Sequence, residues 1–373
     1  MRIGIPRETL FEEKRVALAP AGVDTLVRAG HNVYIQSGAG DESHFHDEEY
    51  RSVGAEIVYS LEEVIQRSEI LAKITPLTDE EAELLENNQI LFSFLHLALG
   101  KKNTIKTLLE KNITAISYEL IENNEHMPVL QSMSEIAGQI AMHIGEKYLK
   151  SDIPNSRGIL VGGIAGVAPA AVVILGAGVV GFNAARAAIG RGAQVIVLDK
   201  DVYKLRRIQN ILGKNITTVA ANPYTIARGV KFADILIGAV QVSGIKSPHI
   251  VTEEMVKTMK KGAVIIDISI DQGGCIETSY PTTISNPTFV KHNVIHYCVP
   301  NIPALVSRTA SYGLTNTSIE YLMEIAENGL INALLGNEGL CRGVCFHQGS
   351  CTNEALANIF NLEFKRLHVF SPN

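Results

Sequence analysis

Short β-rich runs alternate along the chain with amphipathic helical segments, in two long series. Runs of Val, Ile and Leu without polar alternation are typical of strands buried on both faces of a parallel sheet. Strands that alternate with helices predict such a sheet, with helices covering it. The first series predicts strands at residues 2–5, 32–36, 70–74, 90–95 and 114–118, with helices at 21–28, 78–85 and 103–111. The second predicts strands at 171–175, 194–198, 216–219, 235–237, 264–268 and 294–296.

Two longer helical patterns connect these series. Ser132 and Glu135 have the spacing of a capping box, and apolar residues follow at helical spacing, which predicts a helix at residues 133–149. A second apolar stripe predicts a helix at 309–327 that carries the chain back to the first series. We therefore expect an α/β protein of two Rossmann-like doubly wound domains. The first domain is expected to be discontinuous, with residues 1–130 closed by 307–373, and the second to span 131–306.

Composition supports a two-domain protein that binds small ligands. With 373 residues, 46% of them hydrophobic, the chain exceeds the usual size of one core. A net charge of −6 gives no basic field for nucleic acid or an anionic membrane. Residues 158–185 carry no charge and are long enough to span a bilayer, but Pro169 and many glycines would break a lipid-exposed helix. We expect no membrane segment and, without the apolar core of a signal peptide, a cytoplasmic protein.

Five cysteines, all in the last hundred residues, predict reduced thiols rather than a disulfide framework. Cys341, Cys345, His347 and Cys351 lie within eleven residues and are potential soft ligands. Their spacings lack the paired C-x2-C of common zinc sites, so we expect no metal, with a metal at this cluster as the alternative.

Gly176, Gly178 and Gly181 stand between an apolar strand and a helix, which is the setting of a dinucleotide-binding turn. The first glycine makes the tight turn, the second lets a pyrophosphate approach the backbone and the third packs helix against strand. Asp199 ends the next strand, where a carboxylate binds ribose hydroxyls and repels a 2′-phosphate. NAD is therefore favoured over NADP, although Lys200 and Lys204 lie nearby. The alternative is that these glycines serve only a turn.

Three polar residues follow strands of these series and a fourth, Lys73, lies near the end of one, where ligands bind in open α/β sheets. Arg15 is either a surface arginine or a clamp for a carboxylate. His96 is either a core histidine or a group for acid–base work near neutral pH. Asp271 either caps a turn or joins that chemistry, and Lys73 either extends from a strand end or contributes a cation. Together they predict a cleft between domains.

These residues occur in sequence blocks that resemble the family of alanine dehydrogenase and the nucleotide-binding subunit of transhydrogenase. The blocks occur in the same order over nearly the whole chain. They are residues 2–6, 15–22, 92–98, 133–138, the glycine fingerprint, 267–274 and 314–316.

The resemblance implies reversible NAD-linked oxidative deamination of L-alanine to pyruvate and ammonia. It implies that Arg15 binds the substrate carboxylate, that His96 is the general acid–base and that Asp271 orients water or the amine. It also implies homohexamers of two-domain subunits. The implied cofactor-binding residues are Ser134, Gly176, Gly178, Val179, Val180, Gly181, Asp199, Lys204, Val240, Ile268, Ser269, Ile270 and Asn301.

One departure concerns the substrate. The family usually has two lysines in a K-x-K-x-P segment, whereas this chain has Lys73-Ile74-Thr75-Pro76. Either Thr75 takes the place of the second lysine, or Lys73 replaces it as a substrate-binding cation from the same strand face. The alternative substrates are another small oxo acid or an imine. The alternative functions are those of a transhydrogenase-like subunit or a non-catalytic NAD-binding protein. Residues 241–244 also depart from the family pattern.

Overall fold

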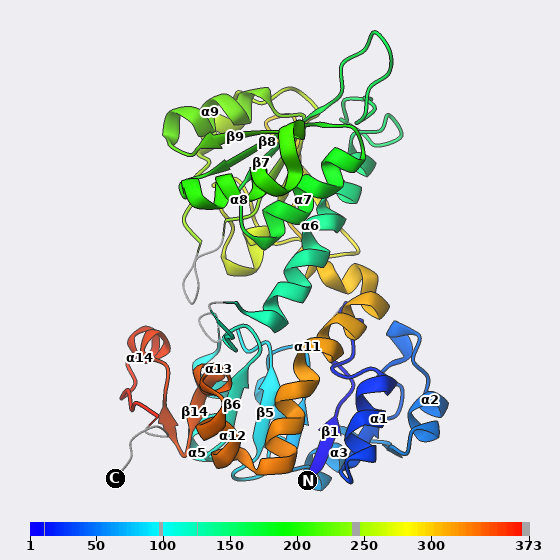
Figure 1. Cartoon of the computed structure of the whole chain (residues 1–373), viewed down its shortest axis with the longest axis vertical. Helices are drawn as coiled ribbons and strands as arrows, with labels where there is room; N and C mark the ends of the chain where they lie inside the picture. Colours follow the sequence, from blue (N-terminus) through cyan, green and yellow to red (C-terminus); the bar gives the residue numbers. More distant parts are fainter. Residues whose placement is uncertain (11, 97–99, 125, 241–246, 368–373) are drawn as a thin grey trace. The chain divides into compact units, whose positions relative to one another are not determined.

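The chain forms two units, which Figure 1 shows in a computed structural model that describes residues 1–10, 12–96, 100–124, 126–240 and 247–367. Unit 1 comprises Met1–Met133 and Ala304–Asn373, and unit 2 comprises Ser134–Pro303. The expected boundaries at 130/131 and 306/307 fall three residues from these. Helix α6 (Pro128–Tyr148) runs from the first unit into the second.

Unit 1 contains a sheet of eight strands within the described residues, in the order β15-β14-β6-β5-β4-β1-β2-β3. The six strands from the N-terminal segment are parallel, and the strand order reverses at β1. The crevice next to such a reversal is where doubly wound sheets bind ligands. The strands are β1 (Arg2–Ile5), β2 (Asn32–Gln36), β3 (Glu56–Val58), β4 (Ile70–Ala72), β5 (Ile90–Ser93), β6 (Thr114–Ser117), β14 (Val344–His347) and β15 (Ser350–Cys351).

The C-terminal segment completes unit 1. Helix α11 lies alongside α1 (Figure 1), and its Ser311 and Thr315 hydroxyls accept the backbone N–H groups of Val16 and Ala19 at 3.0 and 2.8 Å. Strand β14 pairs antiparallel with β6. The helices of unit 1 are α1 (Pro20–Arg28), α2 (Asp47–Ser52), α3 (Leu61–Arg67), α4 (Asp79–Leu84), α5 (Lys102–Glu110), α11 (Ser307–Asn328), α12 (Leu330–Gly336), α13 (Glu338–Gly343) and α14 (Glu354–Phe360), with a 3₁₀ turn η1 (Asp41–Ser43).

Unit 2 has the strand order β12-β13-β11-β10-β7-β8-β9, in which all strands except β12 are parallel. Alternate residues of β7 face two different apolar clusters, Val172 and Ile174 on one face and Val173 and Leu175 on the other. This two-sided burial explains why the run has no polar alternation. The strands are β7 (Ala171–Leu175), β8 (Gln194–Asp199), β9 (Ile216–Ala220), β10 (Ile235–Gly238), β11 (Val264–Asp267), β12 (Thr288–Lys291) and β13 (Val294–Tyr297).

The helices of unit 2 begin at local capping signals. The Asp201 carboxylate accepts the backbone N–H of Tyr203 at 2.8 Å and begins α8, and Asn222 forms a capping box with Thr225 at the start of α9. The elements are α7 (Val179–Gly190), α8 (Val202–Leu212), α9 (Pro223–Phe232), α10 (Glu253–Lys257) and the 3₁₀ turns η3 (Gly213–Asn215), η4 (Ile268–Gln272) and η5 (Ile302–Val306).

The fold class expected from the sequence is confirmed, and the differences are local. The capping box at Ser132 is wrong: α6 begins at Pro128, and the Ser132 hydroxyl donates to the carbonyl oxygen of Val129 at 2.8 Å inside the helix. A proline at the first helical position has φ already set for a helix and needs no N–H partner there. The strands expected to reach residues 74 and 95 end at Ala72 and Ser93.

The uncharged stretch 158–185 contains β7 and the start of α7 rather than one long helix. No helix in the described ranges is both long and apolar enough to cross a membrane.

Candidate active site

The glycine turn of unit 2 follows β7 and has the geometry that each glycine was expected to serve. Gly176 has a φ of +108°, and a Cβ there would meet the carbonyl oxygen of Ala239 at 2.3 Å. A Cβ on Gly181 would meet the carbonyl oxygen of Gly176 at 1.9 Å. Around Gly178 no atom lies within 4 Å of the Cβ position. The backbone is thus open at the second glycine, where a pyrophosphate must approach.

Helix α7 begins immediately after this turn, with Gly178 as its N-cap. The first amides of a helix have no partner within the helix, and its dipole favours negative charge at that end. Because β7 lies between β8 and β10 in the sheet, the turn also lies where the strand order reverses. The turn, the helix start and the strand order therefore fit a dinucleotide. Val179 and Val180 form the first residues of α7, and their contact with a cofactor stays a prediction.

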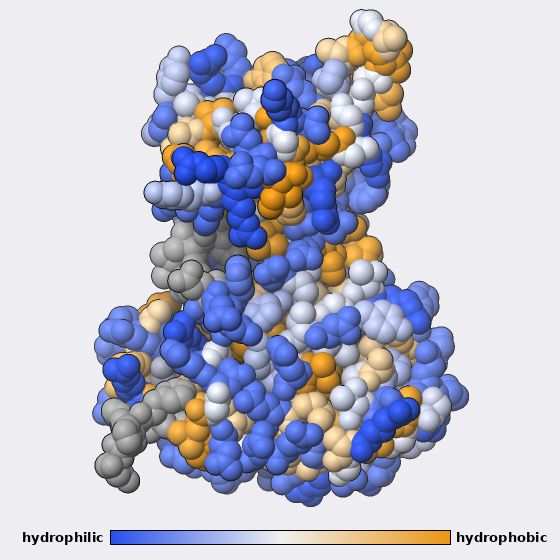
Figure 2. Space-filling view, viewed as in Figure 1, coloured by the Kyte–Doolittle hydropathy of each residue, from blue (hydrophilic) through white to orange (hydrophobic). Residues whose placement is uncertain are grey.

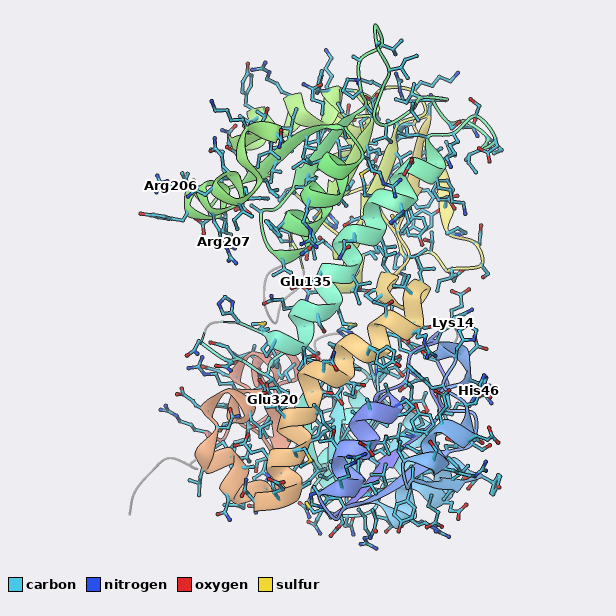
Figure 3. All side chains as sticks on the ribbon, turned by 45° about the vertical axis from the view of Figure 1, so that its right-hand side comes forward. Lys14, His46, Glu135, Arg206, Arg207 and Glu320 are labelled. Atoms are coloured by element: carbon cyan, nitrogen blue, oxygen red, sulfur yellow. The ribbon has the colours of Figure 1, made fainter. Side chains whose placement is uncertain are left out.

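Asp199 is the last residue of β8, and its carboxylate accepts backbone N–H groups from the glycine turn and from the loop before α8. Oδ2 accepts the backbone N–H of Ala177 at 2.6 Å, and Oδ1 accepts that of Asp201 at 2.8 Å. The carboxylate therefore lies beside the glycine turn, as ribose binding requires. Lys204 is exposed on α8, and the neighbouring Arg206 and Arg207 project from that helix in Figure 3.

The other predicted cofactor residues of unit 2 form a connected network after β10 and β11. The Ser269 hydroxyl accepts the backbone N–H of Val240 at 3.0 Å. Asp271 Oδ1 accepts the N–H of Asn301, also at 3.0 Å, and Asn301 has a φ of +60°. Asp267 organises the start of this segment, since its buried carboxylate accepts N–H groups from Ser269, Cys275 and Ile276. Burial raises the pKa of Asp267.

Ser134 lies one helical turn before Gly138 on α6. A Cβ on Gly138 would meet the carbonyl oxygen of Val180 at 2.3 Å, so α6 passes close to the first turn of α7. The segment 241–244, where the chain departs from the family pattern, lies outside the described residues, as do residues 97 and 98 of the His96 block.

In unit 1, Arg15 is buried and paired with Glu13. Its Nε donates to Glu13 Oε1 and its Nη2 to Oε2, both at 2.8 Å. The guanidinium carbon lies 5.9 Å from the ring centroid of Phe94. Because Arg15 is only 6% exposed, it is not the solvated surface arginine of the alternative interpretation.

His96 follows β5 and lies near the same phenylalanine. Its ring centroid is 6.1 Å from that of Phe94, and the two rings are nearly parallel. Glu119 fixes the backbone here, since its carboxylate accepts the N–H groups of Leu95 and His96 at 3.2 and 2.7 Å. The His96 side chain is 42% exposed, so it is not a core histidine. Arg15 and His96 are thus neighbours of one ring.

Lys73 is 1% exposed and directs its ammonium at three oxygen atoms. Nζ lies 2.9 Å from Thr75 Oγ1 and 3.2 Å from both Glu8 Oε2 and Glu81 Oε2. Burial alone would lower the pKa of Lys73, but the two carboxylates outweigh it and hold the pKa above its usual value. Glu8 also accepts the Thr75 hydroxyl at 2.5 Å. Since an ammonium has three donors, contact of Lys73 with a substrate would require one of these bonds to break.

Unit 1 contains an open polar pocket of about 310 Å³ next to Arg15. Residues of the loop after β1 supply most of its wall, and Gly38, Ala39 and Glu42 supply the rest. The loop residues are Arg7, Glu8, Glu12, Glu13, Lys14 and Arg15. Both cationic and acidic side chains line it, which suits a small molecule that carries both charges.

Arg15, Lys73 and His96 belong to unit 1 and Asp271 to unit 2. Their convergence on one cleft therefore stays a prediction. Sequence reasoning missed the carboxylates that hold these groups, namely Glu8, Glu13, Glu81 and Glu119. Local signals existed for two of them. The Glu-x-Arg spacing of Glu13 puts both side chains on one side of an extended segment, and Glu81 completes a capping box with Thr78.

The cysteine cluster has no metal-site geometry in the described ranges, where no group of three or more His, Cys, Asp or Glu side chains is arranged to hold an ion. All five cysteines are free thiols, and Cys345 and Cys351 are buried. Burial raises the pKa of both.

The class of protein indicated is a pyridine-nucleotide-linked oxidoreductase. One unit has a dinucleotide-type turn, and the other is a doubly wound unit with a buried arginine and an exposed histidine. Residues 4–137 match the family model described as "Alanine dehydrogenase/PNT, N-terminal domain", and residues 107–354 match the corresponding C-terminal domain. The chain belongs to the alanine dehydrogenase/PNT family.

Similar proteins include the alanine dehydrogenase of Methanococcus maripaludis, 45% identical over 98% of both chains. The alanine dehydrogenase of Bacillus subtilis is 42% identical, over 98% of this chain and 96% of that one. Among solved structures, an L-alanine dehydrogenase has a TM-score of 0.91 at 38% identity, covering 97% of this chain and 99% of the other. A transhydrogenase from Sinorhizobium meliloti, with a TM-score of 0.80 at 21% identity over 95% and 100% of the two chains, shares the fold.

Proposed function

We propose that the chain catalyses the reversible NAD-linked oxidative deamination of L-alanine to pyruvate and ammonia. Relatives named alanine dehydrogenase match it over 98% of its length at 39–45% identity. The observation that carries the proposal is that Arg15 and His96 are neighbours of the Phe94 ring. A cation for a carboxylate and a group for proton transfer are the two features that a small amino-acid substrate requires.

Arg15 binds the substrate carboxylate in this mechanism. Its planar guanidinium matches a carboxylate with two parallel N–H donors, which fixes the orientation of the substrate as well as its position. Orientation accounts for much of the rate, because the hydrogen on the substrate Cα must face the nicotinamide. Bound NAD supplies the hydride acceptor.

In this mechanism His96 transfers protons and Asp271 orients the attacking water. The imidazole of His96 takes one proton from the water that attacks the iminium carbon and gives it to the nitrogen of the resulting carbinolamine. As ammonia leaves and the carbonyl forms, the remaining hydroxyl proton passes to His96. The carboxylate of Asp271, held at Oδ1 by the Asn301 amide, orients that water. In the reverse direction the same groups orient ammonia toward pyruvate. General acid–base catalysis of this kind contributes about 10²- to 10⁴-fold to a rate.

We propose NAD rather than NADP because of Asp199. Its position beside the glycine turn suits two hydrogen bonds to the hydroxyls of a ribose. A 2′-phosphate at the same point meets a like charge. Arg206 and Arg207 on α8 extend outward from unit 2 in Figure 3.

A second candidate substrate is another small oxo acid, and Thr75 is the observation that favours it. The Thr75 hydroxyl donates to Glu8 Oε2, and Lys73, the nearby cation, is surrounded by carboxylates. Losing a cation that stabilises a developing alkoxide typically costs about 3 kcal/mol, or about a hundredfold in rate.

Absorbance of the reduced nicotinamide tests the proposal. Purified protein is given NAD and a series of amino acids, and alanine is expected to give the fastest reduction. His96→Ala is expected to slow turnover by at least about a hundredfold. Reduction of NAD with another small amino acid but not with alanine would favour the second candidate, the oxo acid that corresponds to that amino acid. Failure with every amino acid would contradict the dehydrogenase assignment.

We also propose that the chain forms homo-oligomers, with the hexamer of the family as the expected form. Support comes from the segment between α6 and β7, where Leu160, Ile164 and Val167 are 60–67% exposed. In Figure 2 this segment is apolar on its surface. Exposed apolar groups of this kind are typical of protein interfaces. Sedimentation tests the proposal, since a monomer at all concentrations would contradict it.

We place the activity in the cytoplasm. All five cysteines are free thiols, which persist in a reducing compartment. Fractionation of the source cells, with the protein followed by antibody, tests this location.

A further inference from the structure

Glu13 turns its carboxylate back onto its own chain and holds Arg15. Oε1 accepts three N–H groups: the Arg15 Nε at 2.8 Å, the Arg15 backbone N at 3.0 Å and the Lys14 backbone N at 3.1 Å. Oε2 accepts the Arg15 Nη2 at 2.8 Å. Both carboxylate oxygens are thus in contact with Arg15, in the paired arrangement that fixes the plane of a guanidinium.

The pair is buried although it lies on a loop. The Glu13 side chain is 0% exposed and that of Arg15 is 6% exposed, whereas Lys14 between them is exposed and pairs with Glu42 at 3.5 Å. Figure 3 labels Lys14 on the loop that follows β1. A buried ion pair is costly to desolvate, and a fold can reach similar stability with apolar residues. Stability alone therefore does not explain the presence of two buried charges beside the unit 1 pocket.

We propose that Glu13 is a positioning residue for substrate binding, which fixes the Arg15 guanidinium so that its Nη1–Nη2 edge meets the substrate carboxylate. This inference rests on the proposed function, in which Arg15 binds that carboxylate. Glu13 occupies the Nε–Nη2 edge of the fork, and the proposal assigns the substrate carboxylate to the Nη1–Nη2 edge, where the printed contact is to a sulfur atom. Arg15 and Glu13 both line the 310 Å³ pocket, so the substrate has space beside them.

Two further contacts support this orientation. Arg15 Nη1 lies 3.3 Å from the sulfur of Met133, which is a weak acceptor that a carboxylate readily replaces. The guanidinium carbon lies 5.9 Å from the Phe94 centroid, which limits tilting of the plane. With Glu13 on one edge and Phe94 beside the plane, the substrate encounters a preorganised fork, and less conformational entropy is lost on binding.

The test measures pyruvate binding to the full chain by calorimetry, without ammonia, so that it does not depend on turnover. Glu13→Gln keeps the shape of the side chain but removes its charge. We expect it to weaken pyruvate binding by about 10- to 100-fold, the effect of losing a charge-assisted hydrogen bond. Glu13→Asp keeps the charge and is expected to recover part of this loss. Glu63→Gln, which breaks a Glu–Arg pair on α3 outside the pocket, is the matched control and should bind like the wild type.

A double-mutant cycle separates positioning from a general effect on the loop. If Glu13 acts through Arg15, Glu13→Gln has no further effect on pyruvate binding in an Arg15→Met background. An equal effect in both backgrounds would overturn the inference, as would wild-type pyruvate binding by a folded Glu13→Gln variant. Loss of stability without a change in pyruvate affinity would also overturn it.

Turnover of the wild type is measured alongside. Wild-type protein that binds pyruvate but reduces no NAD with alanine would contradict the proposed function, while the binding difference at Glu13 would still support positioning. Wild-type protein that binds no pyruvate would overturn the inference itself.

Discussion

The carbonyl oxygen of Gly176 lies 1.9 Å from the position that a Cβ would take on Gly181. No side chain fits there, so Gly181 lets α7 pack against the turn. Gly178 lies between them, with an ordinary φ of −75° and no atom within 4 Å of its Cβ position. The structure therefore requires Gly181, whereas a dinucleotide requires the space at Gly178.

Two alanine substitutions separate these requirements. Gly178→Ala is expected to keep the wild-type free energy of unfolding and to weaken NADH binding by at least about tenfold, because the new methyl group occupies the space of the pyrophosphate. Gly181→Ala is expected to lower the free energy of unfolding by about 1–3 kcal/mol. Urea denaturation and NADH fluorescence titration measure the two effects. Unchanged NADH affinity in Gly178→Ala would contradict the assignment of this turn.

The charge of Asp199 is expected to select the cofactor. Asp199→Asn retains an acceptor for the Ala177 amide, but it loses the charged hydrogen bonds to a ribose and the repulsion of a 2′-phosphate. We expect NADH affinity to fall by about 10- to 100-fold and discrimination against NADPH to decrease. Parallel titrations with NADH and NADPH measure the ratio of the two affinities.

Asp201→Asn is the matched control for that experiment. Asp201 caps α8 through the Tyr203 amide at 2.8 Å, and asparagine is an equally good N-cap. The ratio of NADH to NADPH affinity should stay at the wild-type value. If both substitutions change the ratio equally, local charge rather than ribose contact determines the preference.

The sequence predicted the parts of the molecule that local patterns encode. The all-apolar run of β7 and the glycines after it follow from neighbouring residues, so the dinucleotide turn was evident. Strands β14 and β15 were not predicted, because β14 pairs with β6 more than 200 positions away and no local pattern records that. The start of α6 was misplaced because Ser132 has the spacing of a cap, although Pro128 begins the helix.

The surroundings of the site residues were harder to predict than the residues themselves. Arg15 and His96 were identified by their position after strands and by resemblance. Their partners Glu13 and Glu119 contribute through folded-back or distant contacts. Lys73 shows the consequence, since the sequence presents it as a cation for a substrate. In the fold, Glu8 from the loop after β1 and Glu81 from α4 enclose it.

Removing the Lys73 cation is expected to destabilise unit 1. Lys73→Met leaves Glu8 and Glu81, whose side chains are each 4% exposed, without the charge between them. Breaking a buried ion pair from one side typically costs about 3–5 kcal/mol. Urea denaturation is expected to show this loss, and Glu81→Gln in the same background is expected to recover part of it.

The stability and turnover of His96→Ala are compared with those of Lys73→Met. The His96 side chain is 42% exposed and its φ is +42°, a conformation that disfavours alanine, so the free energy of unfolding should fall by no more than about 1 kcal/mol while turnover slows by at least about a hundredfold. If instead Lys73→Met unfolds at the wild-type urea concentration but loses pyruvate affinity, Lys73 contacts the substrate.

A buried histidine in unit 2 is expected to make stability depend on pH. His296 is 0% exposed, its Nδ1 donates to the Val294 carbonyl at 3.0 Å, and its Nε2 accepts the Thr278 hydroxyl at 2.8 Å. Burial lowers the pKa of His296 to about 4. Between about pH 6.5 and pH 4 the unfolded chain binds a proton that the folded chain does not, so stability falls as the pH decreases.

The expected loss from His296 is about 2 kcal/mol between pH 7 and pH 5, at about 1.4 kcal/mol per pH unit below the unfolded pKa. Other groups also titrate in this range, so the measurement is the difference between wild type and His296→Gln, obtained by urea denaturation at both pH values. Glutamine takes up no proton, and this variant should lose less stability than the wild type on acidification. His143→Gln, at an exposed position of α6, is the control for replacing a histidine by glutamine outside the core. An equal loss of unfolding free energy in wild type and His296→Gln between the two pH values would show that His296 takes up its proton in the folded protein as readily as in the unfolded chain.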